Sequence, residues 1–252
     1  MSEDLSDKVL RPLVTAHRGA SADYPENTLA AFEAGLQAGA DLSECDVHRS
    51  ADGRLMVIHD DTVERTTDGT GRIGDMTAEE IQALDAGGWK GDTFSDQQIP
   101  ELGSVIELHR DHDAHLTIEI KDYSCTADVI GLVKESRAED FVSLCSFSFD
   151  ECVRARELAP EIPVAFIYAG QNERLTPQTL VKKVLSSHIQ ALSVHQSLAS
   201  EALVYECRLR GIGLWVWTVD DEKTIARLRD LGVPNIVTNR PALALEIVGR
   251  SI

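Results

Sequence analysis

Two carboxylates stand two residues apart at Glu44 and Asp46, inside an apolar stretch of the chain. In an extended strand, residues i and i+2 point to the same side, so we expect both acids on one face. Two buried carboxylates on one face cannot both remain charged without a partner. The residues alone leave two kinds of partner open, a divalent metal ion or basic side chains such as Arg18, Arg49 and Lys121.

A third acid, Glu119, lies in the later run IEIK. Three carboxylates would give a ligand set made of oxygen alone, which suits Mg²⁺ or Ca²⁺, with Mn²⁺ as a further candidate. The sequence contains neither a CxxC pair nor a Cys/His set with zinc spacing. Its five cysteines are scattered, and we expect them to be small buried residues in a reducing compartment.

Two histidines complete the set of residues suited to chemistry. His17 follows the apolar run LVTA and His59 follows LMVI, so both are expected at the ends of extended runs. A histidine pair can divide acid and base tasks near neutral pH, with one ring taking a proton from a nucleophile and the other giving a proton to a leaving group. Arg18 offers a two-pronged contact to phosphate oxygens, and Lys121 offers a point charge or an ion-pair partner for the acids.

Short apolar runs alternate with amphipathic stretches along the chain. We expect eight strand–helix units, whose strands begin at residues 13, 41, 115, 141, 164, 190, 213 and 235. This alternation is typical of a (β/α)8 TIM barrel of the α/β class, whereas a doubly wound sheet more often has about five or six strands. We expect a single domain over residues 1–252, with a small insertion after the second strand at about residues 61–100. Thr77 and Glu80 have the spacing of a capping box in that insertion, and Asn27 is the expected N-cap of the first helix.

The barrel fold predicts where a site should lie, because catalytic groups of such barrels sit at the carboxyl ends of the strands. The residues with useful chemistry fall at or near these ends: His17, Glu44, Asp46, His59, Glu119, Lys121 and Trp217.

A long block of motifs runs from residue 17 to residue 71 and contains HRGAS, PENTLAAF, ECDVH, VIHD and VERTT in this order. Farther along the chain come IPELGSVIEL, IEIK, WTV and VTNRP. These motifs resemble the glycerophosphodiester phosphodiesterase family over residues 13–248, which is nearly the whole sequence.

The resemblance implies metal-dependent hydrolysis of glycerophosphodiesters to glycerol 3-phosphate and an alcohol. By matching positions, it implies that His17 and His59 carry general acid–base catalysis and that the metal ligands are Glu44, Asp46 and Glu119.

We expect Arg18, Lys121 and Trp217 to bind the substrate. The WTV motif of the family implies that Trp217 forms an apolar wall for the glycerol moiety, while barrel packing is the alternative role. The chain has Asp220 where the family commonly has asparagine, and Asn239 where it usually has aspartate. From the resemblance, we expect these two departures to bear on fine specificity more than on the chemistry.

The formal net charge of −18 argues against nucleic acid as a partner and against stable association with an anionic membrane. The N-terminal stretch has no apolar region of the kind found in signal peptides, so we expect a cytoplasmic protein with a small-molecule substrate. The insertion is mostly polar, and its large apolar residues, Leu84, Trp89 and Phe94, are expected to form a satellite core. We expect the insertion to cover the catalytic mouth and to favour small deacylated diesters.

Three other functions remain as alternatives. A lysophospholipase D-like phosphodiesterase would need an exposed apolar rim, and a non-catalytic phosphodiester-binding barrel should lack the histidines. A sugar-phosphate isomerase or aldolase would need a phosphate site after the seventh and eighth strands, where we find no glycine-rich turn. We expect the ladder of His109, His112 and His115 to lie on the face opposite the site.

Overall fold

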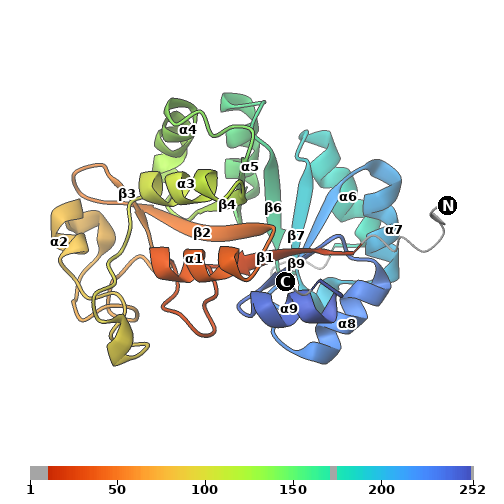
Figure 1. Ribbon diagram of the computed structural model, residues 1–252. Helices are drawn as coiled ribbons and strands as arrows, with labels where there is room; N and C mark the ends of the chain where they lie inside the picture. The colour runs from red at the N-terminus through yellow and green to blue at the C-terminus, as the bar shows by residue number, and fades with distance from the viewer. Residues whose placement is uncertain (1–10, 171–174, 251–252) are drawn as a thin grey trace.

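The computed structural model describes residues 11–170 and 175–250, in which eight parallel strands close into a barrel (Figure 1). The barrel strands are β1 (Leu13–His17), β2 (Leu42–Arg49), β4 (His115–Ile120), β5 (Val142–Ser146), β6 (Val164–Tyr168), β7 (Ala191–His195), β8 (Gly213–Trp217) and β9 (Asn235–Thr238). They pair in the order β2–β4–β5–β6–β7–β8–β9–β1, and pairing of β1 with β2 closes the ring. The expected (β/α)8 TIM barrel is therefore confirmed.

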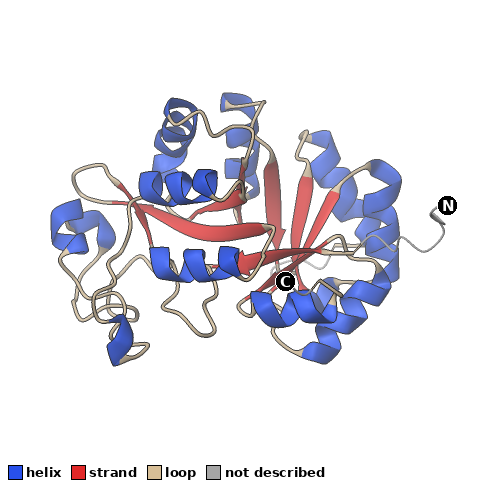
Figure 2. Ribbon diagram, in the orientation of Figure 1, coloured by secondary structure: helices blue, strands red, loops and turns tan. Residues whose placement is uncertain are grey.

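Helices surround the barrel (Figure 2). They are α1 (Leu29–Gln37), α3 (Leu102–Asp111), α4 (Thr126–Glu135), α5 (Phe149–Leu158), α6 (Pro177–Ser186), α7 (Glu201–Arg210), α8 (Glu222–Leu231) and α9 (Pro241–Ile247). The prediction that Asn27 caps α1 is wrong. Thr28 is the N-cap, because its hydroxyl accepts a hydrogen bond from the backbone N–H of Ala31 at 3.2 Å, and this leaves the Asn27 side chain free to turn toward the barrel.

The strands alternate between an outer and an inner face, as a pleated strand must. Outward-facing residues, Cys45 and Val47 among them, belong to the large core between strands and helices. Several inward-facing residues are polar, such as Thr117 and Ser143, whose hydroxyls lie 3.0 Å apart. The same alternation turns Glu44 into the barrel and Cys45 outward into the large core.

The insertion begins after β3 (Leu55–Val57), which pairs antiparallel with β2, and it contains α2 (Ala78–Gln82). Thr77 and Glu80 form the predicted capping box at the start of α2. A second apolar core, separate from the barrel core, is built by Met56, Ile58, Val63, Ile73, Ala78, Ile81, Ala86 and Ile99.

The predicted composition of this second core is mostly wrong. Leu84 packs against it, but Trp89 is 42% exposed, and Phe94 packs on the ring of Tyr24 with centroids 5.3 Å apart. The isoleucines that fill the core have no regular spacing, so no periodic pattern marks them in the sequence.

The insertion lies beside the barrel, next to the carboxyl end of β2 (Figure 1). The Lys90 ammonium group donates to the backbone carbonyl of Ser21 at 2.8 Å, and Arg65 pairs with Glu26, so the insertion touches the β1–α1 loop. No residue of 61–100 lines the cavity at the barrel mouth. The expectation that the insertion covers the mouth is therefore wrong. The insertion flanks the mouth on the side of β1 and β2.

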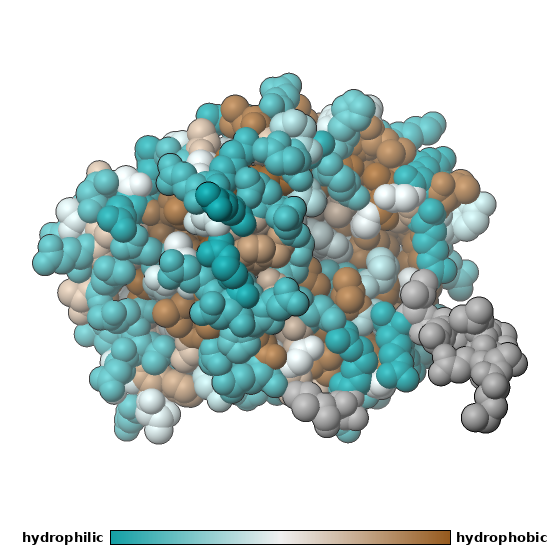
Figure 3. Space-filling model, turned by 45° about the horizontal axis from the view of Figure 1, so that its top comes forward, coloured by the Kyte–Doolittle hydropathy of each residue, from teal (hydrophilic) through white to brown (hydrophobic). Residues whose placement is uncertain are grey.

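On the face shown in Figure 3, hydrophilic residues predominate, and hydrophobic residues lie between them in small groups. Among the described residues, no helix combines the length and the apolar character that a membrane crossing requires.

Candidate active site

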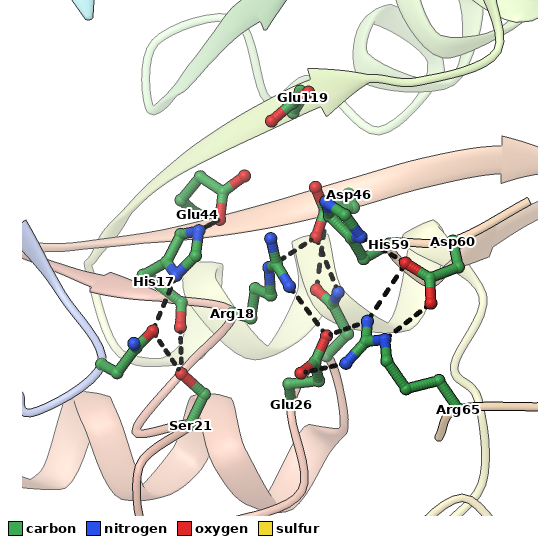
Figure 4. Close-up of polar contacts among 12 residues, drawn as sticks. His17, Arg18, Ser21, Glu26, Glu44, Asp46, His59, Asp60, Arg65 and Glu119 are labelled. Carbon is green, nitrogen blue, oxygen red and sulfur yellow. Dashed lines mark hydrogen bonds and ion pairs between the residues drawn. The ribbon is translucent and has the colours of Figure 1, made fainter. Parts of the chain in front are cut away.

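The carboxyl ends of the strands carry nearly all of the predicted site residues to one cavity. Its lining includes residues from β1, β2, β4 and β8, together with three from the adjoining loops: His17, Arg18, Glu44, His59, Glu119, Lys121 and Trp217. Asp46 lies beneath this surface and is fully buried. Figure 4 shows the two histidines on either side of the acids.

Strand register brings the three acids together. Asp46 on β2 is the direct partner of Glu119 on β4, and Glu44 lies two residues before Asp46 on the same face. One carboxylate oxygen from each acid lies within 4.8 Å of the other two. Among the described residues, this is the one group of three or more His, Cys, Asp or Glu side chains with spacing suited to a metal ion.

The three acids have different protonation preferences. Burial, followed by the charges of Asp46 and Glu119, raises the pKa of Glu44 well above its ordinary value. Burial, followed by the charge of Asp46, raises the pKa of Glu119 to about 7. Burial also acts to raise the pKa of Asp46, but the charges of Arg18 and Lys121 outweigh it and lower that pKa. Asp46 is therefore the firmest anion of the site, while Glu44 and Glu119 ionise less readily than ordinary glutamates.

Two cations from the chain contact the acids. The Lys121 ammonium group lies 2.7 Å from Glu119 Oε1 and 3.2 Å from Asp46 Oδ1, and Arg18 Nε lies 3.1 Å from Asp46 Oδ2. Arg49, the third basic residue that the sequence left open as a partner of the acids, pairs with Asp128 on the exterior instead.

Glu44 shows that these cations do not satisfy the whole cluster. Its Oε2 is buried and has no hydrogen-bond partner among the described residues, and His17 Nε2 lies 3.9 Å away. An orphaned carboxylate oxygen beside two other acids fits a hard divalent cation, which prefers oxygen ligands.

The β1–α1 loop holds Arg18 in place by an unusual backbone path. Arg18 has φ of 56° and Gly19 has φ of 83°, both in the left-handed region. A Cβ on Gly19 would lie 2.4 Å from the carbonyl carbon of Ala31 in α1, so only glycine fits. The turn lets the Arg18 guanidinium reach Glu26 at 2.9 Å as well as Asp46.

The two histidines are held by different groups. His17 Nδ1 lies 2.7 Å from the amide oxygen of Asn239, and burial, followed by the charge of Arg18, lowers the pKa of His17 to about 4. His59 Nδ1 lies 2.5 Å from the carboxylate of Asp60. Burial lowers the pKa of His59, while Asp46 and Asp60 act in the opposite direction.

A bridge of charges connects His59 to the Arg18 loop. The Arg65 guanidinium contacts Asp60 Oδ2 at 2.6 Å and Glu26 Oε2 at 2.8 Å, as Figure 4 shows. The sequence did not reveal the residues that hold the site residues in place without lining the cavity themselves. Nothing in their local pattern indicates a partner far away along the chain. Arg65 stood in the VERTT motif, and Asn27, the expected cap, donates to Asp46 Oδ2 at 2.8 Å.

The opposite wall of the cavity is apolar. Trp217 lines it together with Phe147, which is 45% exposed, and with Ile167 and Trp215. The Trp217 ring meets the rings of Phe147 and His195 edge to face, with centroids 5.6 Å and 5.4 Å apart. Its indole Nε1 is buried and has no hydrogen-bond partner among the described residues.

The histidine ladder lies outside the site, as expected. His109 is buried in α3 with Nδ1 2.7 Å from the carbonyl oxygen of Val105, and His112 pairs with Glu33 at 3.1 Å. The five cysteines are all buried and unpaired in disulfides, which confirms their predicted burial.

The comparisons with known proteins agree with this geometry. The sequence model of the Glycerophosphoryl diester phosphodiesterase family matches residues 17–243. A glycerophosphodiester phosphodiesterase from Caldanaerobacter subterraneus subsp. tengcongensis is 36% identical over 246 residues, which are 95% of this chain and 98% of that protein. Among solved structures, an Oleispira antarctica phosphodiesterase in complex with the product sn-glycerol-3-phosphate has a TM-score of 0.85 and 30% identity, and the match covers 94% of this chain and 96% of that one. A glycerophosphodiester phosphodiesterase from Agrobacterium tumefaciens has a TM-score of 0.82 and 32% identity, with 93% and 99% covered.

Proposed function

Because the chain belongs to the glycerophosphoryl diester phosphodiesterase family, we propose that it hydrolyses glycerophosphodiesters to glycerol 3-phosphate and an alcohol. One observation supports this most strongly. Three buried carboxylates, one of them with an orphaned oxygen, meet two histidines and two cations at the mouth of the barrel.

We assign Glu44, Asp46 and Glu119 as the ligands of a divalent cation, Mg²⁺ or Ca²⁺, with Mn²⁺ as a further candidate. When bound, such an ion neutralises phosphate charge and orients the substrate. Arg18 and Lys121 already lie against the same acids, so they are placed to bind the phosphate oxygens and to stabilise the charge that develops on them.

His17 and His59 are assigned to proton transfer. The lowered pKa of His17 keeps its imidazole neutral at neutral pH, which suits a base. His59, whose Nδ1 contacts the Asp60 carboxylate, is assigned to the other proton transfer, to the leaving alkoxide. Trp217 is assigned to the apolar wall against which the carbon chain of the glycerol moiety packs.

The apolar wall also favours a second candidate, a lysophospholipase D-like activity. Phe147 is exposed at the mouth, and the polar insertion does not cover it. We nevertheless propose deacylated diesters as the preferred substrates, because the insertion beside the mouth is mostly polar and the net charge of −18 opposes docking on an anionic bilayer.

The test is a coupled assay for glycerol 3-phosphate release from a panel of glycerophosphodiesters, with EDTA and after restoring Mg²⁺, Mn²⁺ or Ca²⁺. We expect release that stops with the chelator and returns with a cation. Glu44→Ala, Asp46→Ala and Glu119→Ala should each lose most turnover while they remain folded. Full activity in metal-stripped protein would refute the metal assignment, and a panel without any turnover would refute the function.

A further inference from the structure

The side chain of Asn239, directly after β9, is hydrogen-bonded at both ends. Its Oδ1 lies 2.7 Å from His17 Nδ1, and its Nδ2 donates to Asp220 Oδ2 at 2.7 Å. Ser21 Oγ lies 2.9 Å from the same Oδ1 and 2.7 Å from the backbone carbonyl oxygen of His17. A hydroxyl has a single proton, so Ser21 can donate to only one of these two acceptors at a time.

The carboxylate of Asp220 determines which way the amide of Asn239 faces. Asp220 Oδ1 accepts from the backbone N–H of Asn239 at 2.8 Å and from the hydroxyl of Thr238 at 3.0 Å. Its Oδ2 is left for the Asn239 side chain. Because a carboxylate only accepts hydrogen bonds, the NH₂ group of Asn239 must face Asp220, and the amide oxygen must face His17.

This orientation has a consequence for the imidazole. An amide oxygen accepts but does not donate, so the proton of neutral His17 must sit on Nδ1. Nε2 then keeps its lone pair, and it is Nε2 that lies 3.9 Å from Glu44 Oε2 beside the cavity. The ring nitrogen nearest the acids is thereby the one that can exchange a proton with a reactant.

We propose that Asp220 is a positioning residue that sets the tautomer of His17 through the amide of Asn239. Asp220 itself is not assigned any contact with the substrate. The proposal rests on the proposed function, in which His17 transfers a proton, but the tautomer itself can be measured without any assay of turnover.

The replacement Asp220→Asn tests this directly. The oxygen of the new amide would stay with the backbone N–H of residue 239 and the Thr238 hydroxyl, so its NH₂ would face the NH₂ of Asn239. Two donors cannot pair, and Asn239 is expected to turn its own NH₂ toward His17. His17 Nδ1 would then become an acceptor, and its proton would move to Nε2.

The exchange Asp220→Asn with Asn239→Asp should reverse this effect. The new NH₂ at position 220 would donate to one oxygen of the new carboxylate at position 239. The other oxygen would accept from His17 Nδ1, which restores the original tautomer. Asp221→Asn is the matched control, since it removes the same charge one residue along, where the side chain caps α8 by accepting from Thr224 N–H at 3.0 Å. Asparagine is as good an N-cap as aspartate.

The tautomer is read from the ¹⁵N resonances of the His17 ring in the full-length protein, assigned by their loss in His17→Gln. Wild type, Asp221→Asn and the double variant should show a protonated Nδ1, and Asp220→Asn a protonated Nε2. In parallel, kcat should fall about tenfold or more in Asp220→Asn, with little change in KM, and recover in the double variant. Should Asp220→Asn fail to fold, Asp220→Ala removes the constraint without an opposing NH₂ and should give a mixture of both tautomers.

Two results would overturn the proposal. One is that His17 Nδ1 is protonated to the same extent in Asp220→Asn as in wild type, or in Asp220→Ala if that variant is used. The other is a double variant that folds but keeps the low kcat. Failure of the proposed role of His17 in catalysis has a different signature. His17→Ala would then retain wild-type kcat, whichever tautomer is found in the proteins that keep His17.

Discussion

Replacing Glu119 by Gln should stabilise the protein in the absence of metal, even though it removes a proposed ligand. Burial and the charge of Asp46 raise the pKa of Glu119 from 4.5 to about 7. A carboxyl with a raised folded-state pKa contributes stability below the unfolded pKa and loses it as the pH rises through the folded pKa. The difference of about 2.5 units corresponds to about 3 kcal/mol, at about 1.4 kcal/mol per unit. Wild type should therefore lose stability between pH 4.5 and 7, whereas neutral Gln should not.

The assay is urea unfolding in EDTA at pH 4 and pH 8. Glu119→Gln should match wild type at pH 4 and exceed it by about 3 kcal/mol at pH 8. Glu107→Gln, an exposed position in α3, is the control and should track wild type at both values. Added Mg²⁺ or Ca²⁺ should stabilise wild type at pH 8 and have much less effect on Glu119→Gln, because binding to the folded state alone raises stability.

The opposite outcome would refute the reasoning. If Glu119→Gln is less stable than wild type at pH 8 in EDTA, Lys121 and Arg18 are sufficient partners for the acids. The cluster would then be a self-contained ion-pair network rather than one that requires a metal.

Three further predictions concern the histidines and the substrate. His17→Ala and His59→Ala should each lower kcat by on the order of 10² or more. The double variant should lose less than the product of the two single losses, because both histidines serve one proton-transfer path. A loss equal to that product would argue against a shared path. Burial lowers the pKa of His109 to about 4, so the folded protein should lose stability as the pH falls from 6.5 toward 4, and His109→Phe should flatten that loss in urea midpoints measured across this range; an unchanged slope would contradict it. For one headgroup, kcat/KM should be higher for the deacylated diester than for its monoacyl counterpart below the micellar concentration, and the reverse order would favour the lysophospholipase D-like activity.

Much of the architecture is readable in the sequence because the barrel repeats a simple pattern. Alternation within strands such as residues 42–49 places Cys45 outside and Glu44 inside, and the eight repeats fix the class of fold. Residues at the strand ends, His17 and Glu119 among them, can therefore be placed at one mouth from the sequence alone.

The groups that hold the site residues could not be found in this way. Asn27 looked like a helix cap because Asn favours that position, yet Thr28 next to it makes the cap and Asn27 binds Asp46. The partner of His17 is Asn239, which lies 222 positions along the chain. Such pairings depend on how loops meet in space, and a single sequence has no local periodicity that reports them. The composition of the second apolar core was predicted wrongly for the same reason, because its isoleucines are irregularly spaced.

Because of where His59 lies, we expect activity to be lost at a lower temperature than the one at which the barrel unfolds. His59 follows β3, outside the ring of parallel strands, and Met56 and Ile58, which precede it in the sequence, belong to the smaller apolar core of the insertion. Small peripheral units open at lower free energy than a main core. Opening of the insertion would withdraw His59 together with Arg65 while the barrel, its acids and His17 remain folded. Catalytic activity should therefore fade on heating before the barrel helices melt, and amide hydrogens of residues 61–100 should exchange before those of β4 and β5.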